Sequence, residues 1–298
     1  TLLGNAGANI LSGWGGGDVL RGGAGADRLD GGAGTDAASY YTSAAGVTVD
    51  LAAGTGTGGD AQGDILIGIE NLTGSNLAND TLIGNAGANT LAGWGGSDVL
   101  RGGAGADVLD GGAGTDTASY YTSGTGILVS LASSLGSGGE AQGDTLAGIE
   151  NVSGSQGSDS LYGNTGANVL QGWNGNDILV GRAGQDTLTG GAGADRFVYV
   201  ATAESVVGAN ADRITDFSHA QGDRIELSGI DANTGVAGDQ AFTFIGSGLS
   251  TGVAGQLRAV NSSPGVVTIA GDVNGDGASD FHIQLTGTLV LVAGDFVL

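Results

Sequence analysis

The chain has 298 residues, of which 64 are Gly, 31 are Asp or Glu and eight are Lys or Arg, and its net charge is −23 at pH 7. Such a surface repels nucleic acid and anionic membranes, which argues against a phosphate-binding role. The absence of Cys excludes disulfides and thiolate metal sites. Gly-rich acidic chains are often disordered. Here 40% of the residues are hydrophobic and recur in fixed phase with the glycines, which predicts a folded chain.

A nine-residue phrase accounts for much of the chain. Its form is Gly-Gly-x-Gly-x-Asp-x-Leu-x, and its copies fill three blocks, residues 1–39, 75–119 and 154–199. A longer period lies above it, because the blocks also repeat one another. Since internal repetition decides architecture before local propensity does, we expect a solenoid. The Asp or Asn of successive copies recurs at every ninth position within a block, at Asn9, Asp18, Asp27 and Asp36, then Asp80, Asn89, Asp98, Asp107 and Asp116, then Asp159, Asn168, Asp177, Asp186 and Asp195.

Each copy is expected to form one loop and one minimal strand. The Gly-rich part needs backbone angles that are open mainly to Gly, and the x-Leu-x part has one inward aliphatic residue. Two copies then make one turn of a flattened coil, so that equivalent residues of every second copy stack at about one strand spacing. This places Asp98 between Asp80 and Asp116, and it places Asp107 beside Asn89 on the opposite edge.

The stacked Asp residues predict calcium sites. The aliphatic core is thin, and Gly loses more conformational entropy on folding than any other residue, so something must bridge the loops. Short carboxylates at a fixed place in a turn suit a hard cation, and calcium also binds carbonyl oxygens, at about 2.3–2.6 Å. Pairs on the same edge give two sites in the first block and three in each of the others, so eight ions would bring 16 positive charges against the net charge of −23. The alternative is structural carboxylates without metal.

The candidate ligands occupy three positions of the phrase. The side-chain candidates are Asp18, Asp27, Asp36, Asp80, Asn89, Asp98, Asp107, Asp116, Asp159, Asn168, Asp177, Asp186 and Asp195. The backbone carbonyl candidates are Gly22, Gly25, Gly31, Gly34, Gly102, Gly105, Gly111, Gly114, Gly181, Gly184, Gly190 and Gly193. An Asn at position 9, 89 or 168 removes a charge, so the pairs 9/27, 89/107 and 168/186 are expected to bind more weakly.

The repeat resembles the calcium-binding nonapeptide of RTX (repeats-in-toxin) proteins. The resemblance covers all three blocks and fourteen copies. It implies an all-β fold, a right-handed parallel β-roll or β-helix solenoid, which is disordered without calcium and folds when calcium is bound.

Two inserts, residues 40–74 and 120–153, separate the blocks and match each other closely. Residues 47–51 and 127–131 alternate like strands, and Gly-Ile-Glu-Asn at 68–71 and 148–151 leads back into a repeat. Because the nine-residue register then resumes, we expect wider turns of the same solenoid. Residues 1–199 would thus form one roll.

Three tryptophans, Trp14, Trp94 and Trp173, each replace the second Gly of a copy. Tryptophans spaced along an edge of the solenoid could stack on a polysaccharide. The alternative is that each packs over the aliphatic residues of a neighbouring insert.

Residues 200–298 form a different element, which is expected to cap the roll. A strongly apolar strand precedes it at 196–200, and the repeats stop there. This C-terminal part resembles the C-terminal domain of serralysin-type secreted metalloproteases. An open solenoid end exposes unpaired strand edges, so a cap is needed there.

One loop of the cap has the beginning of an EF-hand pattern. Asp272, Asn274, Asp276 and Asp280 occupy positions 1, 3, 5 and 9, with Gly at position 6, but Ile283 stands where the Glu of position 12 belongs. One further calcium ion is the first interpretation. The alternative is a turn that uses Asp and Asn for its own hydrogen bonds.

The last residues, Asp295 to Leu298, are one acidic residue followed by three apolar ones. They resemble the uncleaved C-terminal signal of type I (ABC-exporter) secretion, and a last hydrophobic strand is the alternative. No run reaches membrane-spanning length. The chain begins within a repeat, so we expect a C-terminal piece of a longer protein that is secreted from bacteria.

Catalytic motifs are missing from the sequence. Its two histidines, His219 and His282, stand far apart, and no His-Glu-x-x-His, no Gly-x-Ser-x-Gly and no Cys nucleophile is present. We therefore expect a non-catalytic module that folds on calcium, with the type I export machinery and an upstream domain of its own polypeptide as partners. The alternatives are a carbohydrate-binding or adhesive module, similar to those of secreted alginate epimerases, and an enzyme in its own right.

Overall fold

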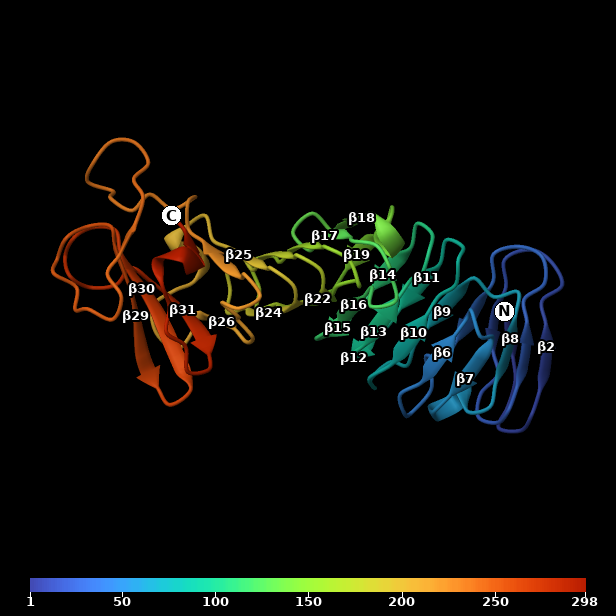
Figure 1. Ribbon diagram of the computed structural model, residues 1–298. Coiled ribbons are helices and arrows are strands. Elements are labelled where there is room, and N and C mark those ends of the chain that lie inside the picture. Colours follow the sequence, from blue (N-terminus) through green and yellow to red (C-terminus); the bar gives the residue numbers. More distant parts are fainter. The chain divides into compact units, whose positions relative to one another are not determined.

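The computed structural model describes residues 1–298 and contains only β-strands and four short 3₁₀ turns (Figure 1). The turns are η1 (Gly59–Ala61), η2 (Gly139–Ala141), η3 (Thr202–Glu204) and η4 (Ala293–Asp295). The chain divides into two compact units, Thr1–Ser153 and Gly154–Leu298. No helix has the length and apolar character that crossing a bilayer requires. The expected all-β roll of mostly parallel sheets is confirmed.

The strands of the first unit follow the repeats and are very short. They are β1 (Leu2–Leu3), β2 (Ile10–Ser12), β3 (Val19–Arg21), β4 (Arg28–Asp30), β5 (Ala37–Ser39), β6 (Thr48–Asp50), β7 (Thr55–Thr57), β8 (Ile65–Ile67), β9 (Asn71–Thr73), β10 (Thr81–Ile83), β11 (Thr90–Ala92), β12 (Gly95–Gly96), β13 (Val99–Arg101), β14 (Val108–Asp110), β15 (Ala113–Gly114), β16 (Thr117–Ser119), β17 (Leu128–Ser130), β18 (Leu135–Ser137), β19 (Thr145–Ala147) and β20 (Asn151–Ser153).

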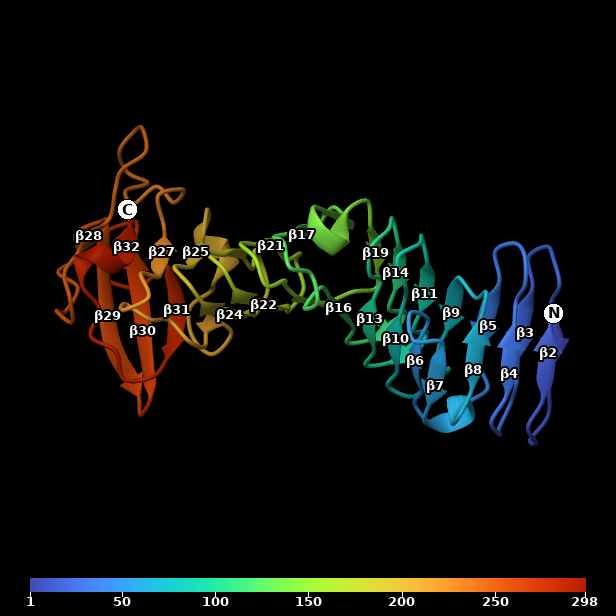
Figure 2. The same cartoon turned by 45° about the vertical axis from the view of Figure 1, so that its right-hand side comes forward.

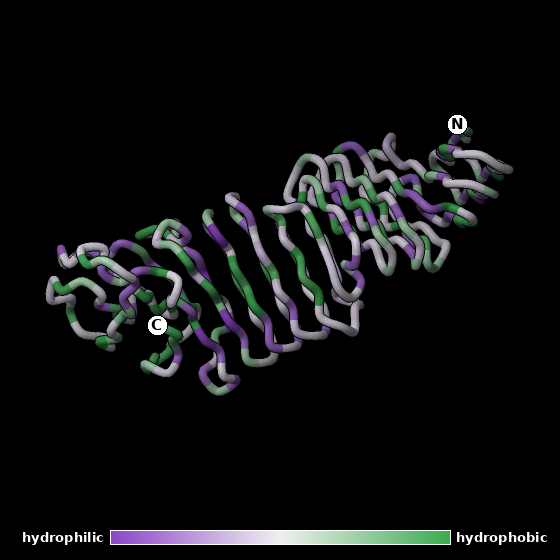
Figure 3. The backbone as a smooth tube through the Cα atoms, turned by 90° about the horizontal axis from the view of Figure 1, so that it is seen from above, coloured by the Kyte–Doolittle hydropathy of each residue, from purple (hydrophilic) through white to green (hydrophobic).

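Except for β12 and β15, which pair with each other, these strands belong to two facing sheets. One has the order β1-β3-β5-β9-β11-β14-β19-β18-β17, and the other has the order β2-β4-β8-β7-β6-β10-β13-β16-β20. Within the second block, parallel partners stand two copies apart, as Leu82 and Leu100 do in one sheet and Leu91 and Leu109 in the other. The central residue of each of these strands is fully buried. Figure 3 shows the result as hydrophobic strands that alternate with neutral and hydrophilic loops.

Each insert completes a turn of the roll and adds a hairpin to it. In the first insert, β8 and β9 pair in parallel with β4 and β5. The added strands β6 and β7 pair antiparallel with each other, and β7 is antiparallel to β8. In the second insert, β17, β18 and β19 repeat this pattern. The predicted wider turns therefore contain antiparallel strands, which the alternation of residues 47–51 did not reveal.

The second unit begins as the same kind of roll and ends in longer strands. It contains β21 (Ser160–Tyr162), β22 (Val169–Asn174), β23 (Ile178–Val180), β24 (Thr187–Ala192), β25 (Arg196–Val198), β26 (Asp212–Ile214), β27 (Arg224–Glu226), β28 (Thr243–Phe244), β29 (Gln256–Ser263), β30 (Val266–Asp272), β31 (Phe281–Thr286) and β32 (Phe296–Val297). Figures 1 and 2 show β29, β30 and β31 side by side as long strands, and they pair antiparallel.

Parallel stacking continues past residue 199, where the repeats were expected to end. Strand β26 pairs in parallel with β24, and β27 pairs in parallel with β25. Strands β31 and β32 extend the two sheets by one more parallel strand each. The reason lies in Asp212-Arg-Ile and Asp223-Arg-Ile, which keep the Asp-x-aliphatic part of the repeat after its glycines are lost. The division of the chain at 199/200 stays a prediction.

Candidate calcium sites in the repeat loops

The repeat carboxylates form ladders along the edges of the roll. Oδ1 of Asp98 accepts a hydrogen bond of 2.7 Å from the backbone N–H of Asp80, and the N–H of Asp98 donates one of 2.7 Å to Oδ1 of Asp116. On the other edge, the N–H of Asn89 donates to Oδ1 of Asp107 at 2.8 Å. The strands that follow these residues hold them in register, because each pairs with the strand two copies later.

The structure brings together both members of all eight predicted pairs. The same backbone-to-carboxylate bond, 2.7–2.9 Å long, joins 9/27, 18/36, 80/98, 89/107, 98/116, 159/177, 168/186 and 177/195. All members except Asn9 and Asp18 are fully buried. That these pairs hold calcium stays a prediction at this point.

Six further carboxylates extend the ladders and were missed in the sequence. The N–H groups of Asp27 and Asp107 donate to the insert residues Asp64 and Asp144. Those of Asp36 and Asp116 donate to Glu70 and Glu150, and those of Asp186 and Asp195 to Asp212 and Asp223. The signal was present, because each of the six stands two positions before an inward aliphatic residue, as the repeat Asp does. The irregular spacing within the inserts and after residue 199 hid it.

The second oxygen of most ladder carboxylates has no partner. Oδ2 is buried and makes no hydrogen bond in Asp27, Asp36, Asp98, Asp107, Asp116, Asp177, Asp186, Asp195 and Asp212. A buried polar atom normally has a partner, and a buried carboxylate without one is costly. A row of unpaired carboxylate oxygens at a loop edge is the donor set that a hard cation requires. The residues therefore fit calcium.

Burial raises the pKa of these carboxyl groups. The pKa of Asp107 is raised to about 7, by burial first and then by the charge of Asp144, and that of Asp177 is raised to about 7 by burial and by Asp159 and Asp195. Burial, with smaller contributions from Asp80 and Asp116, raises the pKa of Asp98 to about 6. No basic side chain neutralises these groups, so a bound cation or protons must do so.

The glycines of the phrase make room for the carboxylate and for the neighbouring loop. A Cβ at Gly102 would lie 2.1 Å from Oδ2 of Asp107. Gly103 has a φ of 93°, and a Cβ there would lie 2.4 Å from the carbonyl oxygen of the stacked Asn85. Carbonyls also approach the carboxylates, because Oδ2 of Asp98 and the carbonyl oxygen of Gly111 both lie against Gly93. Any side chain at these positions would close the space between the loops.

No three His, Cys, Asp or Glu side chains converge as a ready-made metal cluster anywhere in the structure. Each ladder position instead offers side-chain oxygens from two successive turns, two carboxylates in most pairs and one carboxylate with an Asn amide in 9/27, 89/107 and 168/186. A calcium ion prefers six to eight oxygen ligands, so backbone carbonyls have to complete the set, as the Gly candidates were predicted to do.

In the loop Asp272–Asp280, the side-chain oxygens accept hydrogen bonds from the backbone N–H groups of the loop itself. Oδ1 of Asp272 accepts from the N–H of Gly275 at 2.7 Å, and its Oδ2 accepts from Gly277 at 3.0 Å. Oδ2 of Asp280 accepts from the N–H of Val273 at 2.7 Å, and Asn274 and Asp276 each accept from the residue two positions later. This is the turn chemistry of the alternative interpretation, and a metal ion in this loop stays a prediction.

The tryptophans do not form one row. Trp14 follows β2 and Trp94 follows β11, which belong to different sheets, so the two loops lie on opposite edges of the first unit. Trp14 is 86% exposed, and Trp94 packs edge-to-face on Tyr41 of the first insert, with ring centroids 5.0 Å apart. The prediction that the tryptophans line one edge is therefore wrong for these two residues. The alternative, packing against a neighbouring insert, is confirmed for Trp94, although its partner is the aromatic Tyr41 and not an aliphatic residue.

The C-terminal residues are part of the fold. Asp295 is buried and accepts a hydrogen bond of 2.7 Å from the N–H of Val292, and it contacts His219. Phe296 is buried and stacks on Phe244 at a centroid distance of 4.8 Å. In the folded protein the tail is thus a hydrophobic strand, β32, whereas its use as an export signal stays a prediction.

Comparisons with known proteins match both parts of the chain. Residues 139–298 match the family described as Peptidase M10 serralysin C terminal, and residues 3–37, 75–109 and 83–118 match the RTX calcium-binding nonapeptide repeat. None of the curated proteins matches.

Among solved structures, the chain is similar to two subunits of the mannuronan C5-epimerase of Azotobacter vinelandii. AlgE6R3 is 34% identical, with 49% of this chain and 76% of that one covered and a TM-score of 0.37. AlgE6R2 is 25% identical, with 62% and 92% covered and a TM-score of 0.33.

Proposed function

We propose a function from the premise that the chain belongs to the serralysin C-terminal family of peptidase M10 and carries calcium-binding RTX repeats: it is a calcium-folded module of a secreted bacterial protein. The observation that carries the proposal is the row of buried Oδ2 atoms without partners. Such a row is stable only when a cation or protons compensate it. Both matched modules are non-catalytic, and no catalytic domain is evident in this chain.

Calcium would supply both charge neutralisation and folding free energy. The eight predicted pairs, with the loop carbonyls between them, would hold one ion each, and Asp64, Asp144, Asp212 and Asp223 extend the same ladders. Because the sites exist only when the turns are stacked, binding and folding are one process. The chain would then stay unfolded wherever calcium is scarce.

This coupling suits export through a type I channel. RTX repeats and serralysin C-terminal modules are typical of type I secreted bacterial proteins. The chain would cross the exporter unfolded and fold outside the cell, where extracellular calcium modules bind at about 10⁻⁴–10⁻³ M. Folding outside would draw the chain outward, and the folded roll would stabilise an upstream domain of the same polypeptide.

Calcium titration of Asp98→Asn tests the proposal against the alternative of structural carboxylates. The amide introduced by this change could still accept the N–H of Asp80, but it carries no charge to attract a cation. We expect the calcium concentration at the folding midpoint, followed by circular dichroism, to rise about tenfold, the equivalent of about 1.4 kcal/mol. In chelator the variant should be no less folded than the parent, because it has lost a buried charge.

Asp239→Asn is the matched control, since Asp239 is exposed and lies outside the ladders. It should leave the midpoint unchanged. A parent chain that is fully folded in chelator, or an Asp98→Asn variant that is destabilised equally with and without calcium, would show that the carboxylates are structural and would sink the proposal.

A further inference from the structure

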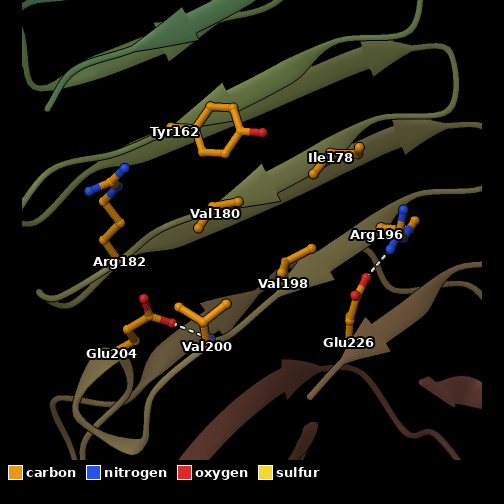
Figure 4. A pocket seen from close by; sticks show the side chains of 9 residues that line it. All are labelled: Tyr162, Ile178, Val180, Arg182, Arg196, Val198, Val200, Glu204 and Glu226. Atoms are coloured by element: carbon orange, nitrogen blue, oxygen red, sulfur yellow. Dashed lines mark hydrogen bonds and ion pairs between the residues drawn. The ribbon is translucent and has the colours of Figure 1, made fainter. Parts of the chain in front are cut away.

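A shallow groove of about 400 Å³ lies on the outer face of one sheet of the second unit, over β21, β23 and β25 (Figure 4). Its floor consists of the outward side chains Tyr162, Ile178, Val180 and Val198. The position of Tyr162, Val180 and Val198 in their strands corresponds to that of Arg101 in β13 and Asp110 in β14. A concave apolar floor of this size is a candidate ligand site.

The register of the roll aligns this floor. Tyr162 pairs directly with Val180, and Val198 occupies the equivalent position on β25, the next strand of the sheet. The three side chains therefore form a stripe that crosses the strands. Figure 4 shows the ring of Tyr162 and the two valines following one another in this direction.

One cation at the rim of the groove has no partner. Arg196 forms an ion pair with Glu226, and Glu204 accepts a hydrogen bond of 2.7 Å from the N–H of Val200. Arg182 is exposed and makes neither an ion pair nor a side-chain hydrogen bond, although the chain carries 31 acidic residues. An unpaired guanidinium beside an apolar floor is complementary to an anion with an apolar body.

The backbone at Arg182 supports a role for this side chain. Arg182 takes the place of the second Gly of its copy and has a φ of 70°, in the left-handed region where Gly103 and Gly191 have 93° and 102°. Side chains other than Gly, Asn and Asp are disfavoured there. Trp14 and Trp94 stand at the same loop position with φ of 72° and 75°, and Trp14 is 86% exposed, so the loop imposes this conformation whatever its residue. At Arg182 the strained position places a guanidinium at the rim of the groove, and strained residues cluster at functional sites.

We infer that the groove binds a free fatty carboxylate, whose alkyl chain lies on the stripe of Tyr162, Val180 and Val198 and whose carboxylate pairs with Arg182. The groove is concave and has a volume of only about 400 Å³, which favours one monomeric acid over a lipid surface. This ligand site goes beyond the calcium-dependent folding proposed above and does not use the ladder carboxylates.

The test uses the calcium-loaded full chain and isothermal titration with octanoate, with octan-1-ol as the uncharged probe. Arg182→Gly restores the residue that the repeat has elsewhere, so it should fold. We expect it to weaken octanoate binding by about 10- to 100-fold, the loss of a charge-assisted contact, while leaving octan-1-ol binding unchanged. Val198→Asp, in the floor, should abolish binding of both probes.

Arg28→Ala, in the first unit, is the control for a loss of charge and should bind both probes as the parent does. Parent chain that is folded by circular dichroism but does not bind octanoate, or an Arg182→Gly variant that binds it as well as the parent, would overturn the inference. Binding of octan-1-ol but not octanoate would overturn it too. Because folding is monitored separately, failure of this site is distinguishable from failure of the calcium proposal.

Discussion

At the scale of single residues, the glycine before each loop decides whether a ladder carboxylate has a place. Gly102 faces Asp107 so closely that a methyl group would overlap Oδ2. The conformational freedom of Gly is not the reason here, since the backbone of Gly102 is not in the left-handed region. The first Gly of the phrase is a steric requirement of the Asp five positions later.

Gly102→Ala should therefore disrupt the 89/107 and 107/144 ladder positions. Overpacking a closed space costs about 1–3 kcal/mol, and we expect that loss in the free energy of unfolding in calcium, measured by urea denaturation. Gly124→Ala is the matched control, because a Cβ at Gly124 meets nothing within 4 Å. Equal stability of the two variants would contradict the steric argument.

At the scale of elements, the inserts keep the ladders continuous, and in them a tyrosine hydroxyl binds the carboxylate oxygen that has no partner in most repeats. Asp64 and Asp144 occupy the place of a repeat Asp, but each also accepts a hydrogen bond from a buried tyrosine, Tyr40 at 3.0 Å and Tyr120 at 3.1 Å. Unlike most Asp residues of the repeats, these two carboxylates leave no oxygen without a partner. The inserts are therefore the parts of the first unit that depend least on a cation.

Tyr120→Phe should leave Oδ2 of Asp144 without a hydrogen bond, as it is in most repeat Asp residues. The change removes a hydrogen bond to a buried carboxylate, which contributes about 1.5–3 kcal/mol. At a calcium concentration just above that needed for folding, the free energy of unfolding should therefore fall by that amount, as followed by chemical denaturation. Tyr41→Phe keeps the ring that packs on Trp94 and serves as the control. Equal free energies of unfolding for the two variants would show that the hydrogen bond from Tyr120 to Asp144 does not stabilise the fold.

How much of this was predictable depends on the regularity of the spacing. All eight Asp–Asp or Asn–Asp pairs followed from counting in nines along the chain, because a parallel roll converts sequence separation directly into stacking. Asp64 and Asp212 were missed because the segments before them have no fixed length. The antiparallel hairpins of the inserts were missed because alternation identifies a strand but not the direction of its partner.

The groove was present in the sequence without being recognised. Tyr162, Val180 and Val198 are separated by two repeat lengths each, so their alignment follows from the same rule as the ladders. Arg182 could not be assigned from spacing, since its left-handed backbone and its missing ion pair appear only in three dimensions. Regular spacing thus predicted how the repeat turns stack. The replacement of a repeat Gly by Arg182 indicated the proposed ligand site only once the fold was known.

At the scale of the whole molecule, the buried carboxylates make stability depend on pH in opposite directions with and without calcium. In chelator, the folded-state pKa values of Asp107, Asp177 and Asp186 are raised to about 7, from 3.8, with burial as the first cause. The folded chain then binds more protons than the unfolded chain between these values. Its free energy of unfolding must fall as pH rises from about 4 to 7.

The chelated chain should accordingly gain β-structure as the pH is lowered from 8 to 5, a range that stays above the pI of about 4.1. In calcium the sign reverses, because protons compete with the ion for the same oxygens, so the calcium concentration at the folding midpoint should rise as pH falls below 7. Circular dichroism across a grid of pH and calcium measures both slopes. A chelated chain whose β-signal is the same at pH 8 and pH 5 would show that the ladder carboxylates do not control folding, since protonation and calcium act on the same unpaired oxygens.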